Sequence, residues 1–366
     1  MSFLPLEMKT IDKYLFKRFL ITYVFAVLVI VLIILVIDFV EKNDDFLEKN
    51  APMSEILFSY YLNLAPYWAN YISPLMIFIS TVFFTAKLAA HTEIIAILTS
   101  GTSFRRLMLP YFMGAGVVAI FSFIMVGWIL PKLNKTRIDF ENKYIKDQFF
   151  FNERDFHLAI QKDTYVYFSS YSNQSQTAYD FTIEKFDGNK LLEKLSARRI
   201  AWVDSLQTWR LYDYQIREFG IMKDEMTFGK TPMDSAVGMF PSDFESTHAI
   251  YETFTIPELN DRIALIKTRG EEGIASFEIE RYQRFATPFA VIILSMMGLI
   301  VAARKKRGGV GLQIAIGFVL AFIYILFYIM AKGIAESGNM SPLLAVWLPN
   351  LVFSGIAFLM YFTIPK

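Results

Sequence analysis

Residues 19–37 read FLITYVFAVLVIVLIILVI, a stretch without a single charged side chain. A helix needs about 20 apolar residues to cross the hydrocarbon core of a bilayer. The stretch resembles the start of a secretory signal, but it is longer than the apolar part of such signals. Asp38 and Phe39 follow it in place of a cleavage site. We therefore interpret it as a retained first membrane span.

Further stretches of similar length and composition follow. They cover residues 60–86, 107–130, 285–303, 310–331 and 343–364. The second of the six spans contains Pro66 and Pro74 and the sixth contains Pro349, so we expect kinks there, which membrane helices tolerate where neighbours satisfy the backbone. Overall, 54% of the 366 residues are hydrophobic and 19% are charged. This composition is typical of a polytopic membrane protein.

The loops differ in charge, which predicts the orientation of the spans. The N-terminus, residues 87–106 and residues 304–307 are basic, whereas the loop expected at residues 38–59 is mainly acidic. Lysine and arginine accumulate in the cytoplasmic loops of membrane proteins. We therefore expect both termini in the cytoplasm and the long block 131–284 outside.

The outer block predicts an antiparallel β domain. The segments DTYVYFSS, YDFTIEKFDG, NKLLEKLSARRIAWVD and QTWRLYDYQIREFG are rich in aromatic and β-branched residues, with turn residues between them. The expected fold is an α-helical polytopic membrane protein with six transmembrane helices (3+3) and an inserted extracytoplasmic, jellyroll-like β domain. The expected domains are residues 1–130, a β domain at 131–256, and 257–366, which begins with a linking helix.

Several function classes lack their usual residues. None of the six predicted spans contains an ionisable Asp, Glu, Lys, Arg or His, which argues against a proton- or ion-coupled carrier and against a charged-ring channel. The chain has no cysteine and only three scattered histidines, so we expect no metal site and no catalytic residues. A formal charge of +1 gives no general attraction to nucleic acid. No nucleotide-binding P-loop occurs, so we expect no cofactor on this chain.

Residues 91–107, HTEIIAILTSGTSFRRL, predict a short amphipathic helix on the cytoplasmic side. Its apolar residues at helical spacing are Ile94, Ile95, Ile97 and Leu98. Thr92 can cap its start and Gly101 its end. Two interpretations remain open: an ordinary helix at the membrane surface, or a coupling helix that docks on a separate ATPase. In the second, Glu93 is the polar anchor and the isoleucines fill a groove.

Several segments in order along the chain resemble the LptF/LptG family of lipopolysaccharide-export ABC-transporter permeases. They are EIIAILTSGTSFRRLMLP, IDKYLFKRFLITY, YISPLMIFIST, QTWRLYD and MSPLLAVWLPNLVF. The resemblance covers nearly the whole chain, including the layout of three spans, β domain and three spans. The opening and the SGTS segment favour the LptG type.

The resemblance implies a transport role for the chain in the inner membrane of a Gram-negative type of bacterium. Its implied partners are a cytoplasmic ABC ATPase dimer that uses ATP and magnesium, a second LptF/LptG-type permease, a periplasmic bridge protein of the LptC/LptA type, and membrane lipid. Lipopolysaccharide is the implied substrate, extracted from the inner membrane and passed on toward the outer membrane. The residues implied in ATPase coupling are Glu93, Ile94, Ile97, Leu98 and Gly101. Those chosen by helical spacing for a substrate cavity and lateral gate are Phe25, Leu28, Leu32, Phe318, Phe322 and Ile325, with Lys42 at the outer end of the first span.

One departure from the family pattern concerns phosphate recognition. Some family members carry several basic residues at the outer end of the first span, whereas here the sequence is IDFVEKNDDFLEKN, with only Lys42 and Lys49 as cations. Binding of lipid phosphates at this position is therefore in question. Two alternatives to an ATP-driven permease are a membrane-anchored binding or assembly protein that acts through its β domain, and a secondary transporter, which the uncharged spans disfavour.

Overall fold

The computed structural model describes residues 9–145, 154–161, 163–220, 223–229, 231–244, 250–269, 273–303 and 309–362. The basic residues 304–307 lie outside this set. The chain forms two compact units. The helical unit comprises Met1–Ile145, Tyr251–Leu259 and Ala275–Lys366, and the sheet unit comprises Lys146–Ile250 and Asn260–Ile274. Residues 131–145, expected in the β domain, thus belong to the helical unit.

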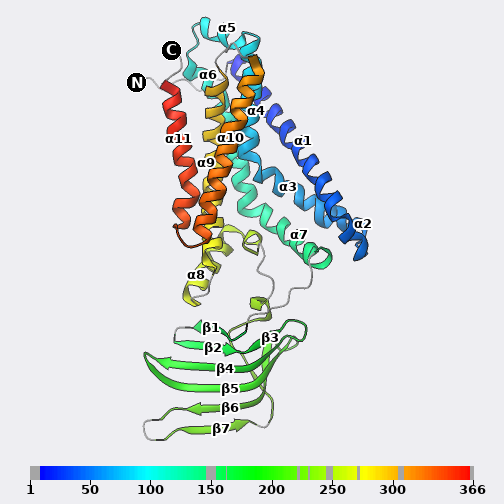
Figure 1. Ribbon diagram of the computed structural model, residues 1–366, viewed down its shortest axis with the longest axis vertical. Coiled ribbons are helices and arrows are strands. Elements are labelled where there is room, and N and C mark those ends of the chain that lie inside the picture. Colours follow the sequence, from blue (N-terminus) through cyan, green and yellow to red (C-terminus); the bar gives the residue numbers. More distant parts are fainter. Residues whose placement is uncertain are drawn as a thin grey trace. The chain divides into compact units, whose positions relative to one another are not determined.

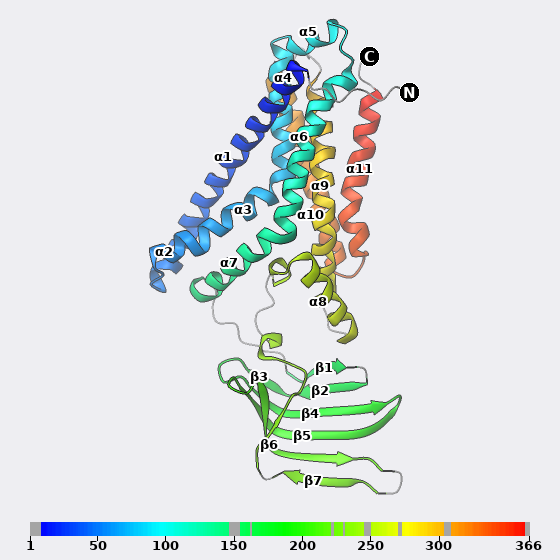
Figure 2. The same ribbon diagram turned by 180° about the vertical axis from the view of Figure 1, so that it is seen from behind.

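Six helical segments of the described chain are long and apolar enough to cross a membrane, and this confirms the predicted number. They are α1 (Thr10–Glu48), α4 (Ser73–Ala90), the run from α6 (Phe104–Ile124) to α7 (Leu130–Tyr144), α9 (Ile274–Ala302), α10 (Gly309–Glu336) and α11 (Pro342–Phe362). Figures 1 and 2 show them as one bundle, with the start of α1 and the end of α11 at the same end as the short helix α5 (Glu93–Thr99).

Helix α1 is longer than the span that the sequence predicts. The prediction of an acidic loop at residues 38–59 is wrong for residues 38–48, which are helical. The helix continues to Glu48 because its last turns pack on protein. Phe46 is buried against Tyr60 and Phe140, with ring centroids 6.0 Å apart in both pairs. Asp38 and Lys42, one helical turn apart, form an ion pair at 2.9 Å.

The second predicted span is divided into separate helices rather than merely kinked. A short helix, α2 (Met53–Glu55), and a π-helical turn, η1 (Ile56–Tyr61), lead into α3 (Leu62–Tyr71), and α4 starts at Ser73. Pro74 stands in the first turn of α4, where its missing N–H costs nothing. Figures 1 and 2 show α3 diverging from the line of α4.

The third predicted span does not end at residue 130. A π-helical turn, η2 (Met125–Ile129), connects α6 to α7, which runs on to Tyr144. Helix α7 is amphipathic, and its inner face carries the buried polar residues Asn134, Arg137 and Glu141. Hydropathy alone could not assign this polar helix to the membrane half of the chain, because the charged residues on its inner face form ion pairs beside the aromatic packing of Phe140 and Tyr144.

Helix α4 is central to the bundle, because both α1 and α10 pack against it. Close approach of α1 to α6 depends on Gly114, where a Cβ atom would lie 2.5 Å from the ring of Phe19. Asn350 connects the last three spans: its amide nitrogen donates to the carbonyl of Ala286 at 2.9 Å, and its oxygen accepts from the Tyr324 hydroxyl at 3.0 Å. Helix α11 runs through Pro349 without interruption.

The sheet unit contains one antiparallel sheet in the order β1-β2-β4-β5-β6-β7, with β3 paired to β4 and β8 to β6. The strands are β1 (Phe156–Gln161), β2 (Thr164–Phe168), β3 (Ser170–Ser172), β4 (Thr177–Asp187), β5 (Lys190–Val203), β6 (Thr208–Glu218), β7 (Glu225–Gly229) and β8 (Met233–Ser235). Each of the four quoted segments forms a strand, and Gly188 takes the left-handed conformation (φ +59°) at the β4–β5 turn. Trp209 is fully buried and donates to the Met239 carbonyl at 2.8 Å. The antiparallel β domain between two helical halves is confirmed.

The remaining described elements lie between the last strand and α9. They are the short helices η3 (Pro241–Phe244) and η4 (Ile250–Thr253) and the helix α8 (Ile256–Arg269). The helical segment expected before the fourth span is thus present as α8 and the first turns of α9. Helix η4 belongs to the helical unit and carries Glu252, which takes part in the site described below.

Candidate functional site

The predicted short helix at residues 93–99 is present as α5. Glu93 is in its first turn and is exposed. Thr92 is not the expected cap, because it has a left-handed backbone (φ +63°) and its hydroxyl donates to His91. Gly101 ends the segment with φ +86°, a conformation that favours glycine.

The apolar residues of α5 do not all point the same way. Ile94 is buried at 1% exposure in a core cluster with residues of α1, α4, α6 and α9, and Ile97 and Leu98 pack against the same cluster. Ile95 is 44% exposed on the outer face, together with Glu93. The predicted single stripe is therefore divided, and Ile94 faces the protein's own core.

The segment after α5 is tied to neighbouring spans by its two arginines. Arg106 forms an ion pair with Asp12 at the start of α1. Arg105 donates to the Tyr361 hydroxyl near the end of α11 at 2.9 Å. The start of α6, which follows α5 directly, is thus linked to α1 and α11.

The residues chosen for a lateral gate lie mostly on exposed apolar faces of α1 and α10. Phe25 and Phe322 are 67% and 61% exposed, and Leu28, Leu32 and Phe318 are exposed as well. The two others lie elsewhere. Lys42 is half-buried in its ion pair with Asp38 against the ring of Tyr60, and Ile325 is half-buried in the wall of a pocket.

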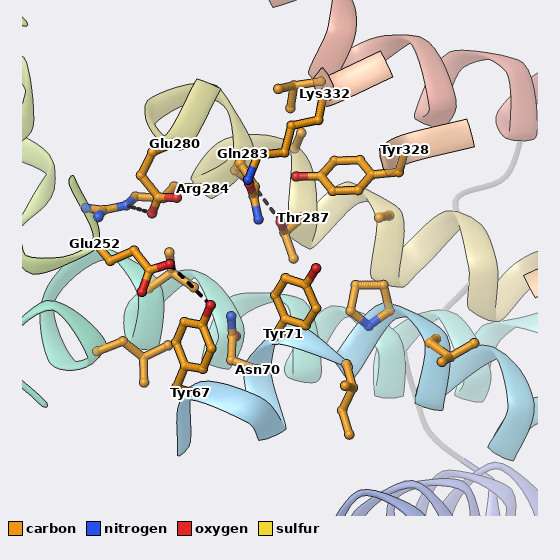
Figure 3. A pocket seen from close by; sticks show the side chains of 18 of the residues that line it. Tyr67, Asn70, Tyr71, Glu252, Glu280, Gln283, Arg284, Thr287, Tyr328 and Lys332 are labelled. Carbon is orange, nitrogen blue, oxygen red and sulfur yellow. Dashed lines mark hydrogen bonds and ion pairs between the residues drawn. The ribbon is translucent and has the colours of Figure 1, made fainter. Parts of the chain in front are cut away.

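This pocket, of about 180 Å³, lies in the helical unit at the end opposite α5. Its wall comes from α3, α4, η2, α7, η4, α9, α10 and α11. Figure 3 shows Glu252, Glu280 and Arg284 at one end of the pocket and Tyr328 and Tyr71 toward the other. Apolar residues including Leu75, Ala290 and Ile325 complete the wall.

A buried charge network forms the first of these ends. Glu252 accepts from Arg137 of α7 at 3.0 Å and from the Tyr67 hydroxyl of α3 at 3.2 Å. Arg137 also pairs with Glu141 at 3.1 Å. The network therefore fastens η4, the segment that returns from the sheet unit, to two helices of the bundle.

Arg284 of α9 fastens the same segment from the other side. It is 1% exposed, pairs with Glu280 at 2.9 Å, and donates to the carbonyl oxygens of Phe254 at 2.6 Å and Tyr251 at 3.3 Å. A buried arginine with all these partners is a fixed part of the structure and not a free cation.

Arg284→Met is expected to lower the free energy of unfolding by about 3–5 kcal/mol, because it removes a fully buried cation and leaves the partly buried Glu280 carboxylate and two backbone carbonyls without their partner. Thermal unfolding of the purified protein in detergent measures the loss. Lys143→Met is the control: Lys143 pairs with Glu55 across an exposed surface at 3.3 Å, and loss of such a pair costs at most about 1 kcal/mol. Equal shifts for the two variants would contradict the structural role of Arg284.

Glu252 also has an altered acidity. Burial, followed by the nearby Glu280 carboxylate, raises the pKa of Glu252 from its usual 4.5 to about 7, although Arg137 opposes the change. Since the folded pKa is the higher one, the protonated form favours folding. The contribution of Glu252 to the free energy of unfolding is complete below pH 4.5 and is lost as the pH rises to 7.

Wild type should therefore lose stability relative to Glu252→Gln between pH 4.5 and pH 7. The expected relative change is up to about 3 kcal/mol, because each pKa unit corresponds to about 1.4 kcal/mol. Thermal unfolding of both proteins across this pH range measures it. Parallel pH profiles would show that Glu252 titrates normally.

Sequence reasoning missed this pocket. Its charged residues come from three elements remote in sequence, and only Glu280 and Arg284, one helical turn apart, gave a local signal. Glu252 sits in a short helix between the sheet unit and α8, where an acidic residue is ordinarily solvated. Its burial depends on Arg137, more than a hundred residues earlier in the chain.

Comparison with known protein families shows which family the sequence matches. A family model described as "Lipopolysaccharide export system permease LptF/LptG" matches residues 13–362. No curated protein matches the chain significantly. The matched range runs from the first span to the last.

Proposed function

The chain belongs to the LptF/LptG family of lipopolysaccharide-export permeases, and from this premise we propose that it drives export with energy from a separate ATPase. The family makes it a non-catalytic membrane-spanning subunit of an ABC transporter in the inner membrane. The observation that carries the proposal is the exposed outer face of α5 in a chain whose sequence has no P-loop.

The ATPase, an ABC dimer that binds ATP and magnesium, docks on this outer face in the cytoplasm. Glu93 is the charged contact and Ile95 the apolar one, since both are exposed. Ile97 and Leu98 transmit the contact, because they pack on the bundle core. This arrangement replaces the predicted insertion of Ile94, which is buried. Gly101 allows the turn back into α6.

The exposed faces of α1 and α10 form a lateral gate with a second LptF/LptG-type permease. Phe25, Leu28 and Leu32 of α1 and Phe318 and Phe322 of α10 offer apolar surface suited to acyl chains. Both helices contact α4, so motion of the central helix reaches both sides of the gate. Lipopolysaccharide enters here from the outer leaflet of the inner membrane and passes by the periplasmic sheet unit to a bridge protein of the LptC/LptA type.

Lys42 has a different role from the one that its position in the sequence suggested. Its ammonium group is committed to Asp38 and Tyr60, so it stabilises the extended end of α1. The phosphates of the substrate are accordingly bound by the partner permease and not by this end of α1.

Mass spectrometry of the intact complex, extracted in mild detergent, tests the proposed assembly. Two ATPase copies and two permease chains with bound glycolipid are expected. A single permease chain that carries no ATPase would instead favour a membrane-anchored binding or assembly protein.

A further inference from the structure

The pocket in the helical unit contains polar groups that the protein itself does not satisfy. Among the residues that the structure describes, three buried atoms of its wall have no hydrogen-bond partner: Asn134 Oδ1, Gln283 Oε1 and the Tyr328 hydroxyl. Asn134 is only 3% exposed. A buried polar atom without a partner costs about 1–3 kcal/mol. Three of them on one wall indicate that the pocket is completed by a ligand.

The unsatisfied groups specify the ligand's chemistry. Two are amide oxygens, which accept hydrogen bonds and therefore require N–H or O–H donors. They share the pocket with the carboxylates of Glu252 and Glu280, which attract a cation. Burial, followed by the neighbouring Glu280 carboxylate, raises the pKa of Glu252, and a bound cation would favour its charged form. A primary ammonium group offers both the charge and the donors.

The rest of the pocket suits a phosphate and an acyl chain. The Lys332 ammonium group stands 3.8 Å from Glu336, longer than a hydrogen bond. The Tyr328 hydroxyl is a further donor. In Figure 3, Tyr328 and Tyr71 lie away from the acidic end of the pocket. Leu75, Ala290 and Ile325 belong to the apolar wall.

We propose that the pocket binds the phosphoethanolamine headgroup of a membrane lipid. The ammonium group lies at Glu252 and Glu280, the phosphate lies at Lys332 and Tyr328, and the first acyl carbons lie against the apolar wall. The sequence of acid, base and apolar groups along the pocket matches that of ammonium, phosphate and acyl chain in the lipid.

The glycerol and choline headgroups of other membrane lipids fit the pocket less well than ethanolamine. A glycerol headgroup leaves the lipid anionic and offers no cation to the two carboxylates. A choline headgroup has the cation, but its trimethylammonium group has no N–H to donate to Asn134 and Gln283. The pocket should therefore prefer phosphatidylethanolamine over both. This preference is independent of the proposed export function, because the site lies within one chain.

Native mass spectrometry of the full chain tests the proposal. The delipidated protein is titrated with phosphatidylethanolamine, phosphatidylglycerol and phosphatidylcholine of identical acyl chains. One phosphatidylethanolamine should bind about tenfold or more tightly than either other lipid, the size of one charge-assisted hydrogen bond. Equal affinities for the three lipids would overturn the proposal.

Two variants locate the binding. Tyr328→Phe and Gln283→Leu each remove an unsatisfied polar group, so neither should impair folding. Gln283→Leu should reduce the preference for phosphatidylethanolamine, whereas Tyr328→Phe should weaken binding of all three lipids, because they share the phosphate. Tyr111→Phe is the control, since Tyr111 is a buried tyrosine of α6 outside the pocket wall. An unchanged preference in Gln283→Leu together with an unchanged lipid affinity in Tyr328→Phe would contradict the assigned site.

Competition with soluble phosphoethanolamine identifies the source of the ligand. Displacement of the bound lipid would show that the headgroup alone suffices. Retention of the lipid in a pocket that Tyr328→Phe weakens would show that the acyl chain contributes. Failure of both the lipid and soluble phosphoethanolamine to bind wild type would refute the site.

Discussion

Replacement of Glu93 by alanine is expected to weaken binding of the ATPase roughly 30-fold or more. Loss of one partner from a buried interfacial charge pair costs about 2–5 kcal/mol, and each 1.4 kcal/mol is tenfold in affinity. Glu93 is exposed in the isolated chain and sits in the first turn of α5. Titration of the purified permease with the labelled ATPase measures the effect.

Variants of the two neighbouring isoleucines distinguish an effect on ATPase docking from an effect on folding. Ile95→Ala should weaken the ATPase contact and leave the melting temperature unchanged, because Ile95 is 44% exposed. Ile94→Ala should instead cost about 2–5 kcal/mol of stability, because it leaves a cavity in the core. If ATPase binding is normal in both Glu93→Ala and Ile95→Ala, α5 is an ordinary surface helix.

The second large effect concerns the lateral gate. A photo-crosslinking phenylalanine analogue at Phe25 or Phe322 should form a covalent adduct with lipopolysaccharide, because both side chains project from α1 or α10 into the proposed path. The adduct should decrease when ATP is hydrolysed and the substrate leaves. Gel analysis of the irradiated complex with an antibody against the glycolipid measures it.

Phe358 of α11 is the matched control for this experiment. It is 63% exposed, against 67% for Phe25 and 61% for Phe322, so its contact with ordinary lipid is comparable. The same analogue at Phe358 should give adducts with phospholipid and not with lipopolysaccharide. Equal glycolipid adducts at the three positions would show that α1 and α10 form no specific gate.

Much of the membrane fold is predictable because a bilayer imposes a simple length and composition on each span. The six spans follow from this constraint, and the turn at Gly188 follows from its local residues. The extension of α1 to Glu48 is harder to predict from the sequence, because its charged residues are typical of a loop. Only weak local features of the sequence indicate that the helix continues. Asp38 and Lys42 are one helical turn apart, and the apolar Phe46 follows one turn later.

The sites are less predictable than the spans because they depend on tertiary contacts. Periodicity predicts the helix at Glu93, but it could not tell that the core takes Ile94 and leaves Ile95 exposed. The pocket is harder still. Its ion pair between Arg137 and Glu252 joins two helices separated in sequence by all eight described strands, and no local pattern indicates such a pairing.

ATP-dependent release of lipopolysaccharide from proteoliposomes tests the central claim most directly. The permease pair and its ATPase are reconstituted with the glycolipid, and the amount transferred to a soluble bridge protein is measured with ATP and with a non-hydrolysable analogue. Transfer with ATP, none with the analogue, and its loss in Glu93→Ala are expected. Equal transfer with ATP and with the analogue would contradict the account.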